Sequence, residues 1–172
     1  DISSGETIAC HYKDFPDHFG FFLPLAGIST VKQIRESAFD IRATSRLNRL
    51  YVELIKDNPD WGSSDRRDDM NHFMARLIFC FFAEDTGIFD DGQFTTAVGS
   101  HTQSDGSDVQ EFLTDLFDAL DAEKPEDKAS YLSAFPYVNG RLFEVTSQHL
   151  VPAFTKSARG LLLDLGALDW SE

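Results

Sequence analysis

The chain has 172 residues, of which 42% are hydrophobic and 26% charged, and its net charge is −14. This length suits one globular domain, and sixteen Phe, four Tyr and two Trp are more aromatic residues than a disordered acidic tail carries, which excludes intrinsic disorder. The strong negative charge opposes binding to a phosphate backbone, so the chain by itself should bind nucleic acid poorly.

The two ends of the chain suggest a fragment. The chain begins at Asp1 instead of Met and ends at Glu172 shortly after an apolar run, so we expect part of the function to lie outside it. No stretch approaches the roughly 18 apolar residues that would span a membrane, and no signal peptide is found, which predicts a cytoplasmic protein without a membrane partner. Cys10 and Cys80 lack the spacing of a disulfide framework or zinc site, and we expect both to be buried.

The first 28 residues are expected to differ from the rest. Residues 7–12 suit a short strand that would need a partner, and an aromatic segment interrupted by proline and glycine follows, which predicts short turns. We predict residues 1–28 to be the trailing edge of an upstream domain, packed on a helical domain at residues 29–172. The fold class is mainly α, a compact multi-helix domain with turn-rich aromatic connections and at most one short N-terminal strand.

Residues 41–56 have the apolar spacing of an amphipathic helix, which DNPDWG at residues 57–62 should end. The opposite face gathers cations into a narrow stripe, with Glu53 among them. This basic strip consists of Arg42, Arg46, Arg49 and Lys56. We predict that it faces DNA or an acidic partner domain; a solvated helix face with intrahelical ion pairs is the simpler alternative.

A second helix, over residues 68–86, is expected to be central because apolar residues surround its second half, and Gly87 is placed to cap its end. Glu84 falls on the same stripe as Phe73 and Phe81, which would carry a carboxylate into the interior. We predict that Glu84 or Asp85 accepts hydrogen bonds from backbone amides or an arginine and ties the helix to a neighbouring segment. Alternatively, the helix frays and both acids reach water.

Two more helices are predicted. One begins with a capping box, Ser107 and Gln110, and has apolar residues at helical spacing as far as Leu120. The other closes the chain over residues 150–165, after a turn-rich hydrophobic segment. Between Glu84 and Lys128 the chain has thirteen Asp or Glu residues and two Lys, so most of the negative charge is local.

Three strings imitate catalytic motifs. Asp121, Glu126 and Lys128 resemble a nuclease metal cluster, but Pro125 and the flanking charges indicate a solvated loop. DNPDWG resembles the N-P-P-aromatic loop of amino-methyltransferases, but Asp60 replaces the second proline and a helix stop is the better interpretation. LLLDLGALDW supplies only Gly166 where a cofactor-binding loop needs at least two glycines. We therefore predict no catalytic, cofactor-binding or metal-binding residue in this chain.

Five segments, taken in order, resemble the helical spacer of large single-chain N6-adenine DNA methyltransferases. They are RLNRLYVELIKDNPDWG, MNHFMARLIFCFFAEDTGIF, DGSDVQEFLTDLFDAL, FPYVNGRLFE and GALDWS, and FCFFAEDTGIF is the most specific string. The family includes restriction enzymes that fuse a nuclease to a methyltransferase, and related phage-defence methyltransferases. The resemblance implies a nuclease-like domain before this chain and a methyltransferase core after it.

The resemblance also implies S-adenosylmethionine for the parent protein, and Mg²⁺ if its nuclease is intact. It implies a bacterial or archaeal cytoplasmic protein that binds DNA through its full length, with the flanking nuclease and methyltransferase domains as partners. The leading hypothesis is a non-catalytic connector that positions these modules on DNA. The alternative is an acidic protein-interaction module, even a DNA mimic, that presents its carboxylates to a basic protein.

Overall fold

The computed structural model describes residues 38–144 and 150–171, and every regular element in these ranges is a helix. The mainly α fold class is thereby confirmed, whereas the predicted strand at residues 7–12 and Cys10 lie outside the described residues. The chain divides into two units, Asp1–Thr44 and Ser45–Glu172, and the features below belong to the second unit unless stated. No helix among the described residues is long and apolar enough to cross a membrane.

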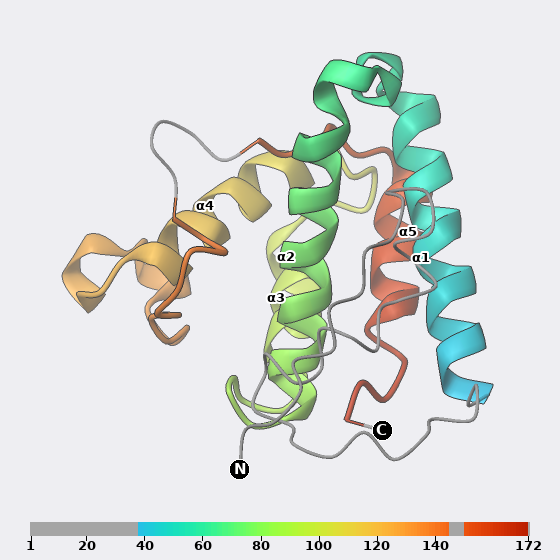
Figure 1. Ribbon diagram of the computed structural model, residues 1–172. Helices are drawn as coiled ribbons and strands as arrows, with labels where there is room; N and C mark the ends of the chain where they lie inside the picture. The colour runs from blue at the N-terminus through green and yellow to red at the C-terminus, as the bar shows by residue number, and fades with distance from the viewer. Residues whose placement is uncertain (1–37, 145–149, 172) are drawn as a thin grey trace, which may run out of the picture. The chain divides into compact units, whose positions relative to one another are not determined.

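The α-helices are α1 (Ala38–Asp57), α2 (Arg67–Asp85), α3 (Gln93–His101), α4 (Val109–Asp121) and α5 (Lys156–Leu165). The connections from α1 to α4 are short, whereas the one from Asp121 to Lys156 is long (Figure 1). The 3-10 turns are η3 (Pro59–Gly62), η4 (Ser64–Arg66), η5 (Pro125–Asp127) and η6 (Ser130–Leu132). α1 crosses the boundary between the two units, so only its part from Ser45 onward belongs to the second.

The core is organised around α2, as its apolar pattern predicts. Phe73 is fully buried, and its ring lies 6.3 Å from Phe117 of α4 and 6.2 Å from Phe154, which precedes α5. Two turns further on, Phe81 meets Phe94 of α3 at 5.1 Å. Burial of each such side chain contributes roughly 1.5–3 kcal/mol, so α2 holds the other elements through aromatic contacts in both its first and its second half.

The predicted ends of α2 are confirmed to within one residue. After Asp85, Gly87 adopts a left-handed φ of 77°, and the amide of Ile88 donates to the carbonyl of Ala83 at 3.1 Å. This backbone reversal satisfies a carbonyl at the end of the helix. Any residue with a Cβ would be strained at this position, which is why glycine follows the run FCFFAEDT.

The capping box predicted for α4 is wrong. The helix begins at Val109, and the Ser107 hydroxyl donates to Asp105 at 2.8 Å instead of accepting a helix amide. The Gln110 side chain donates to the carbonyl of Val151 at 2.7 Å. Both side chains of the expected box are therefore engaged elsewhere, one in a local turn and the other in a contact 41 residues along the chain.

The closing helix is shorter than predicted. α5 starts at Lys156, six residues after the expected start, and the Thr155 side chain caps it by accepting from the amide of Ala158 at 3.3 Å. The residues before it have no helical assignment, because the backbone of Val151 and Ala153 hydrogen bonds to the side chains of Gln110 in α4 and of Asn58 just after α1. The helix α3 was not predicted at all.

Candidate functional site

Glu84, one of the two acids expected to be buried, lies inside the protein with 3% of its surface exposed. Its carboxylate accepts the backbone amide of Thr95 at 2.8 Å and the Thr95 hydroxyl at 2.5 Å. The Thr95 amide belongs to the first turn of α3, whose N-cap residue, Gly92, offers no side chain. Glu84 of α2 therefore supplies the cap that α3 lacks in its own sequence.

The surroundings of Glu84 have opposing effects on the pKa of its carboxyl group. Burial raises the pKa of the carboxyl, the two hydrogen bonds from Thr95 lower it, and the result lies above its ordinary value. The partial positive charge at the N-terminus of α3 favours a carboxylate at this position. A titratable group is thus buried where a helix end partly compensates its charge.

Asp85 ties the same end of α2 to the segment after α5. Its carboxylate accepts the backbone amide of Trp170 at 2.6 Å. The Trp170 ring stacks on Phe81 with 5.4 Å between the ring centroids, and its indole N–H donates to the carbonyl of Leu165 at 3.0 Å. Adjacent acids of α2 therefore fix two segments that are distant in sequence.

Asn58 ties the end of α1 to the extended segment before α5. Its side-chain amide donates to the carbonyls of Leu54 and Ala153, both at 2.9 Å, and its side-chain oxygen accepts the amide of Ala153 at 3.0 Å. In DNPDWG, Asn58 is thus buried and engaged by both its side-chain nitrogen and its side-chain oxygen, so it serves as a structural link. The prediction of a helix stop at this string is confirmed.

The residues of the basic strip have two different roles in the structure. Arg46 is half-buried and donates to the carbonyl of Asp164 in the last turn of α5, and Lys56 pairs with Glu53 at 3.2 Å. Hydrogen bonds from Ser157 and from Lys56 hold the pKa of Glu53 below its ordinary value. Arg42, which belongs to the first unit, and Arg49 are exposed and have no hydrogen bond or ion pair among the described residues. The strip is partly a helix contact and partly an open cationic surface.

The nuclease-like string does not assemble into a metal site. Glu126 is exposed in η5, and the Lys128 ammonium donates to the carbonyl of Phe135 at 2.7 Å, so it fixes a turn. Across residues 38–144 and 150–171, no group of three or more His, Cys, Asp or Glu side chains has an arrangement that could hold a metal ion.

Gly166, in the string resembling a cofactor loop, has a packing role. A Cβ on Gly166 would lie 2.0 Å from the Thr95 hydroxyl oxygen, so only glycine lets α3 approach the end of α5 so closely. The space that a bound nucleotide would need next to this backbone is filled by Thr95. These residues therefore do not fit S-adenosylmethionine.

Arg76 is a structural residue that the sequence analysis missed. It is 3% exposed, its Nε donates to the carbonyl of Leu142 at 2.8 Å, and its guanidinium lies 5.4 Å from the centre of the Phe117 ring. Burial lowers the pKa of this arginine, while Asp121 and Asp118 oppose the shift. Its position three residues after Phe73, on the buried stripe, was a signal that could have revealed it.

Comparison with protein families finds two matches. Residues 68–143 match the model described as MmeI, helicase spacer domain, and residues 1–57 match the model described as MmeI, N-terminal domain. The spacer match contains α3, α4 and all of α2 except Arg67, and therefore both acids and the helix that Glu84 caps.

Two individual proteins are also similar. The protein named DNA methyltransferase A of Bacillus subtilis (strain 168) is 37% identical over 173 residues, covering 100% of this chain and 19% of that protein. A solved structure of the type IIL restriction-modification enzyme MmeI in complex with DNA is 35% identical, with a TM-score of 0.65, covering 77% of this chain and 17% of that one. The chain thus spans less than a fifth of the length of either relative.

Proposed function

This chain belongs to the MmeI family and contains its helical spacer domain, and on that premise we propose that the domain is a non-catalytic connector. It positions a nuclease-like module and a methyltransferase module of the parent protein on DNA. The parent is proposed to be a site-specific adenine-N6 DNA methyltransferase that uses S-adenosylmethionine, with Mg²⁺ if it also cuts DNA. The names of the two relatives, a DNA methyltransferase and a restriction-modification enzyme, support this proposal.

The observation that carries the proposal is the way in which α2 is tied to three other segments, namely α3 and the segments before and after α5. Asp85 and Phe81 hold Trp170 after α5, Glu84 caps α3, and Phe73 packs on Phe154. A connector has to transmit a fixed geometry, and a closely packed core with satisfied buried polar groups resists deformation.

The acidic-module alternative gains less support from the same residues. A DNA mimic presents carboxylates to a basic partner, but several carboxylates of the acidic segment accept hydrogen bonds within the domain. These are Glu84 from Thr95, Asp85 from Trp170, Asp105 from Ser107, Asp108 from Gln103 and Asp115 from Tyr131. We therefore favour the connector.

The remaining assignments follow the same proposal. The parent acts in the bacterial or archaeal cytoplasm and binds DNA through its full length, whereas this domain alone binds it weakly or not at all. The boundary between an upstream edge at residues 1–28 and the spacer at residues 29–172 remains a prediction, as does the contact of the basic strip with DNA or a neighbouring domain.

Single-molecule energy transfer between dyes on the two flanking modules of the full-length protein tests the positioning role. The wild type should give one narrow distribution of transfer efficiency. Asp85→Ala combined with Trp170→Ala should broaden it, because the segment after α5 loses its anchor on α2. Lys124→Ala, at an exposed residue, is the control. Equal widths for all three proteins would contradict the proposal.

The non-catalytic assignment is tested separately. Asp121→Ala and Glu126→Ala in the full-length protein should leave the rate of DNA methylation, and of any DNA cleavage, unchanged within about twofold, since Glu126 is exposed and the half-buried Asp121 acts on Arg76 inside the spacer. Loss of either activity without a change in melting temperature would show that the domain contributes chemistry.

A further inference from the structure

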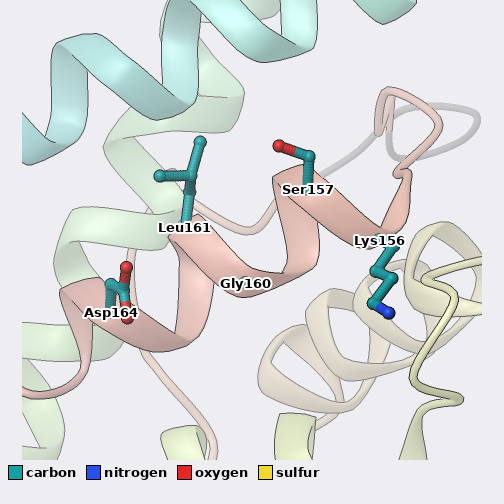
Figure 2. Close-up of a pocket in the computed structure, with 5 residues that line it drawn as sticks. All are labelled: Lys156, Ser157, Gly160, Leu161 and Asp164. Atoms are coloured by element: carbon teal, nitrogen blue, oxygen red, sulfur yellow. The ribbon is translucent and has the colours of Figure 1, made fainter.

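A shallow hollow of about 510 Å³ lies along α5. It is lined by Lys156, Ser157, Gly160, Leu161 and Asp164 (Figure 2). A Cβ on Gly160 would meet no atom within 4 Å, so the middle of the hollow is open. Leu161 is half-buried and supplies an apolar wall beside it.

Two residues of α1, Arg46 and Glu53, contact residues that line this hollow. Arg46 bonds to the carbonyl of Asp164, and Glu53 accepts a hydrogen bond from Ser157. From the first contact to the second, the chain advances by seven residues on α1 and goes back by seven on α5. The two helices are therefore antiparallel here. Since Arg49 lies between the two contacts on the same ridge of α1, it is level with Leu161.

Some of the charged side chains around the hollow have partners within the domain, and others have none among the described residues. Glu53 is paired with Lys56, and Arg46 is engaged with the end of α5. Arg49 on α1 and Lys156 at the start of α5 are exposed and have no hydrogen bond or ion pair within the described residues. Two available cations therefore flank a partly apolar hollow in a chain whose net charge is −14. The exposed carboxylate of Asp164 lies at one end.

We propose that this hollow on α5, together with the neighbouring face of α1, is a docking site for an acidic amphipathic helix from a flanking module of the parent protein. An apolar side chain of that helix lies over Gly160 and Leu161, and its carboxylates pair with Arg49 and Lys156. The proposal rests on the connector function and names the surface through which the connector holds a neighbour.

Protein fits this surface better than DNA does. Glu53 and Asp164 place carboxylates along the same surface, and duplex DNA presents a negative charge about every 1.7 Å, so phosphates could not avoid both. The apolar wall at Leu161 is a feature that a phosphate backbone does not use. A helix can place its few carboxylates opposite the cations and an apolar residue opposite Leu161.

Photo-crosslinking in the full-length protein tests the proposal. The photo-reactive amino acid p-benzoylphenylalanine replaces Gly160, where the structure has room for it, and the cross-linked peptides are mapped by mass spectrometry with and without a DNA duplex. The expected product joins position 160 to a segment of the same protein outside residues 38–171 that has apolar residues at helical spacing and at least two carboxylates.

Charge reversal provides the matched comparison. Arg49→Glu with Lys156→Glu should lower the cross-linking yield at least about fivefold, because two ion pairs become repulsive. Lys124→Glu with Arg141→Glu makes the same change of charge at two exposed residues remote in sequence from the hollow, and should leave the yield within about twofold.

Several results would overturn the docking site: a cross-link to DNA, a cross-link to a segment without carboxylates, no cross-link above background, or an equal loss of yield in both charge-reversed proteins. Failure of the docking site is distinguishable from failure of the connector function. If the energy-transfer distribution still broadens in the Asp85→Ala and Trp170→Ala protein, the domain is a connector whose neighbours dock elsewhere.

Discussion

The end of α2 and the outer face of α1 both gather charged residues, but the two regions use them differently. At the end of α2, Glu84 is buried and Asp85 half-buried, and their carboxylates accept hydrogen bonds from Thr95 and Trp170. On α1, Arg49 and Lys56 are exposed, and only Lys56 has a partner, Glu53, three residues away.

The difference follows from solvation. A buried polar group that loses its partner costs about 1–3 kcal/mol, and more if it is charged, so each buried acid has to be satisfied by a defined neighbour. An exposed cation is solvated by water and can change partners at little cost. The buried acids therefore determine structure, whereas the exposed cations of α1 remain available for binding. Four predictions test this contrast, from the largest expected effect to the smallest.

Removal of the buried carboxylate should have the largest effect. Glu84→Ala is expected to lower the free energy of unfolding by about 2–4 kcal/mol, because it deletes two hydrogen bonds, leaves the Thr95 amide without its acceptor and creates a cavity. Urea denaturation of the 172-residue chain measures it. A loss below about 1 kcal/mol would show that α3 does not depend on this cap.

Replacement of two glycines of the C-terminal region by alanine should change the stability in opposite directions. Gly166→Ala should destabilise by about 1–3 kcal/mol, because its Cβ would overlap Thr95 next to Glu84. Gly160→Ala should stabilise by about 0.5–1 kcal/mol, because it enters open space in the middle of α5 and improves helix propensity. Thermal unfolding of both variants checks the contrast, and a shift of the same sign for both would refute it.

The pH dependence of the free energy of unfolding should show whether Glu84 titrates as a buried acid. Because the pKa of Glu84 is raised on folding, its contribution to stability is fully present below the unfolded pKa of 4.5 and is lost as the pH rises through the folded value. Glu84→Gln cannot titrate, so the stability of the wild type relative to this variant should decrease as the pH rises from 4 towards neutral. Urea titrations along this series measure the difference, and a constant difference would contradict the raised pKa.

Charge reversal on the open surface should have the smallest effect. Arg49→Glu is expected to change the free energy of unfolding by no more than about 0.5 kcal/mol, since its side chain is exposed and has no ion pair among the described residues. The melting temperature of the isolated chain provides the measurement. A loss comparable to that of Glu84→Ala would mean that Arg49 is structural and not available to a partner.

Much of the helical framework was predictable from local patterns. The apolar spacing correctly placed α1, α2 and α4, Gly87 marked the end of α2, and DNPDWG marked the end of α1. Helical spacing puts Glu84 on the same face as Phe73 and Phe81, which indicated a buried acid. The sequence did not identify Thr95 as the residue that hydrogen bonds to Glu84. These predictions succeed because apolar periodicity and glycine conformation act within a few residues.

The sequence by itself determined which segments have an apolar face long enough to form a buried helix. Only the tertiary structure decided that residues 93–101 are helical and that α5 starts at Lys156. The cap of α3 comes from Glu84, and the extended segment before α5 is held by Asn58, 95 residues away along the chain. A helix end that depends on a hydrogen bond from a distant segment leaves no local signal, since its acceptor or donor is not among its sequence neighbours.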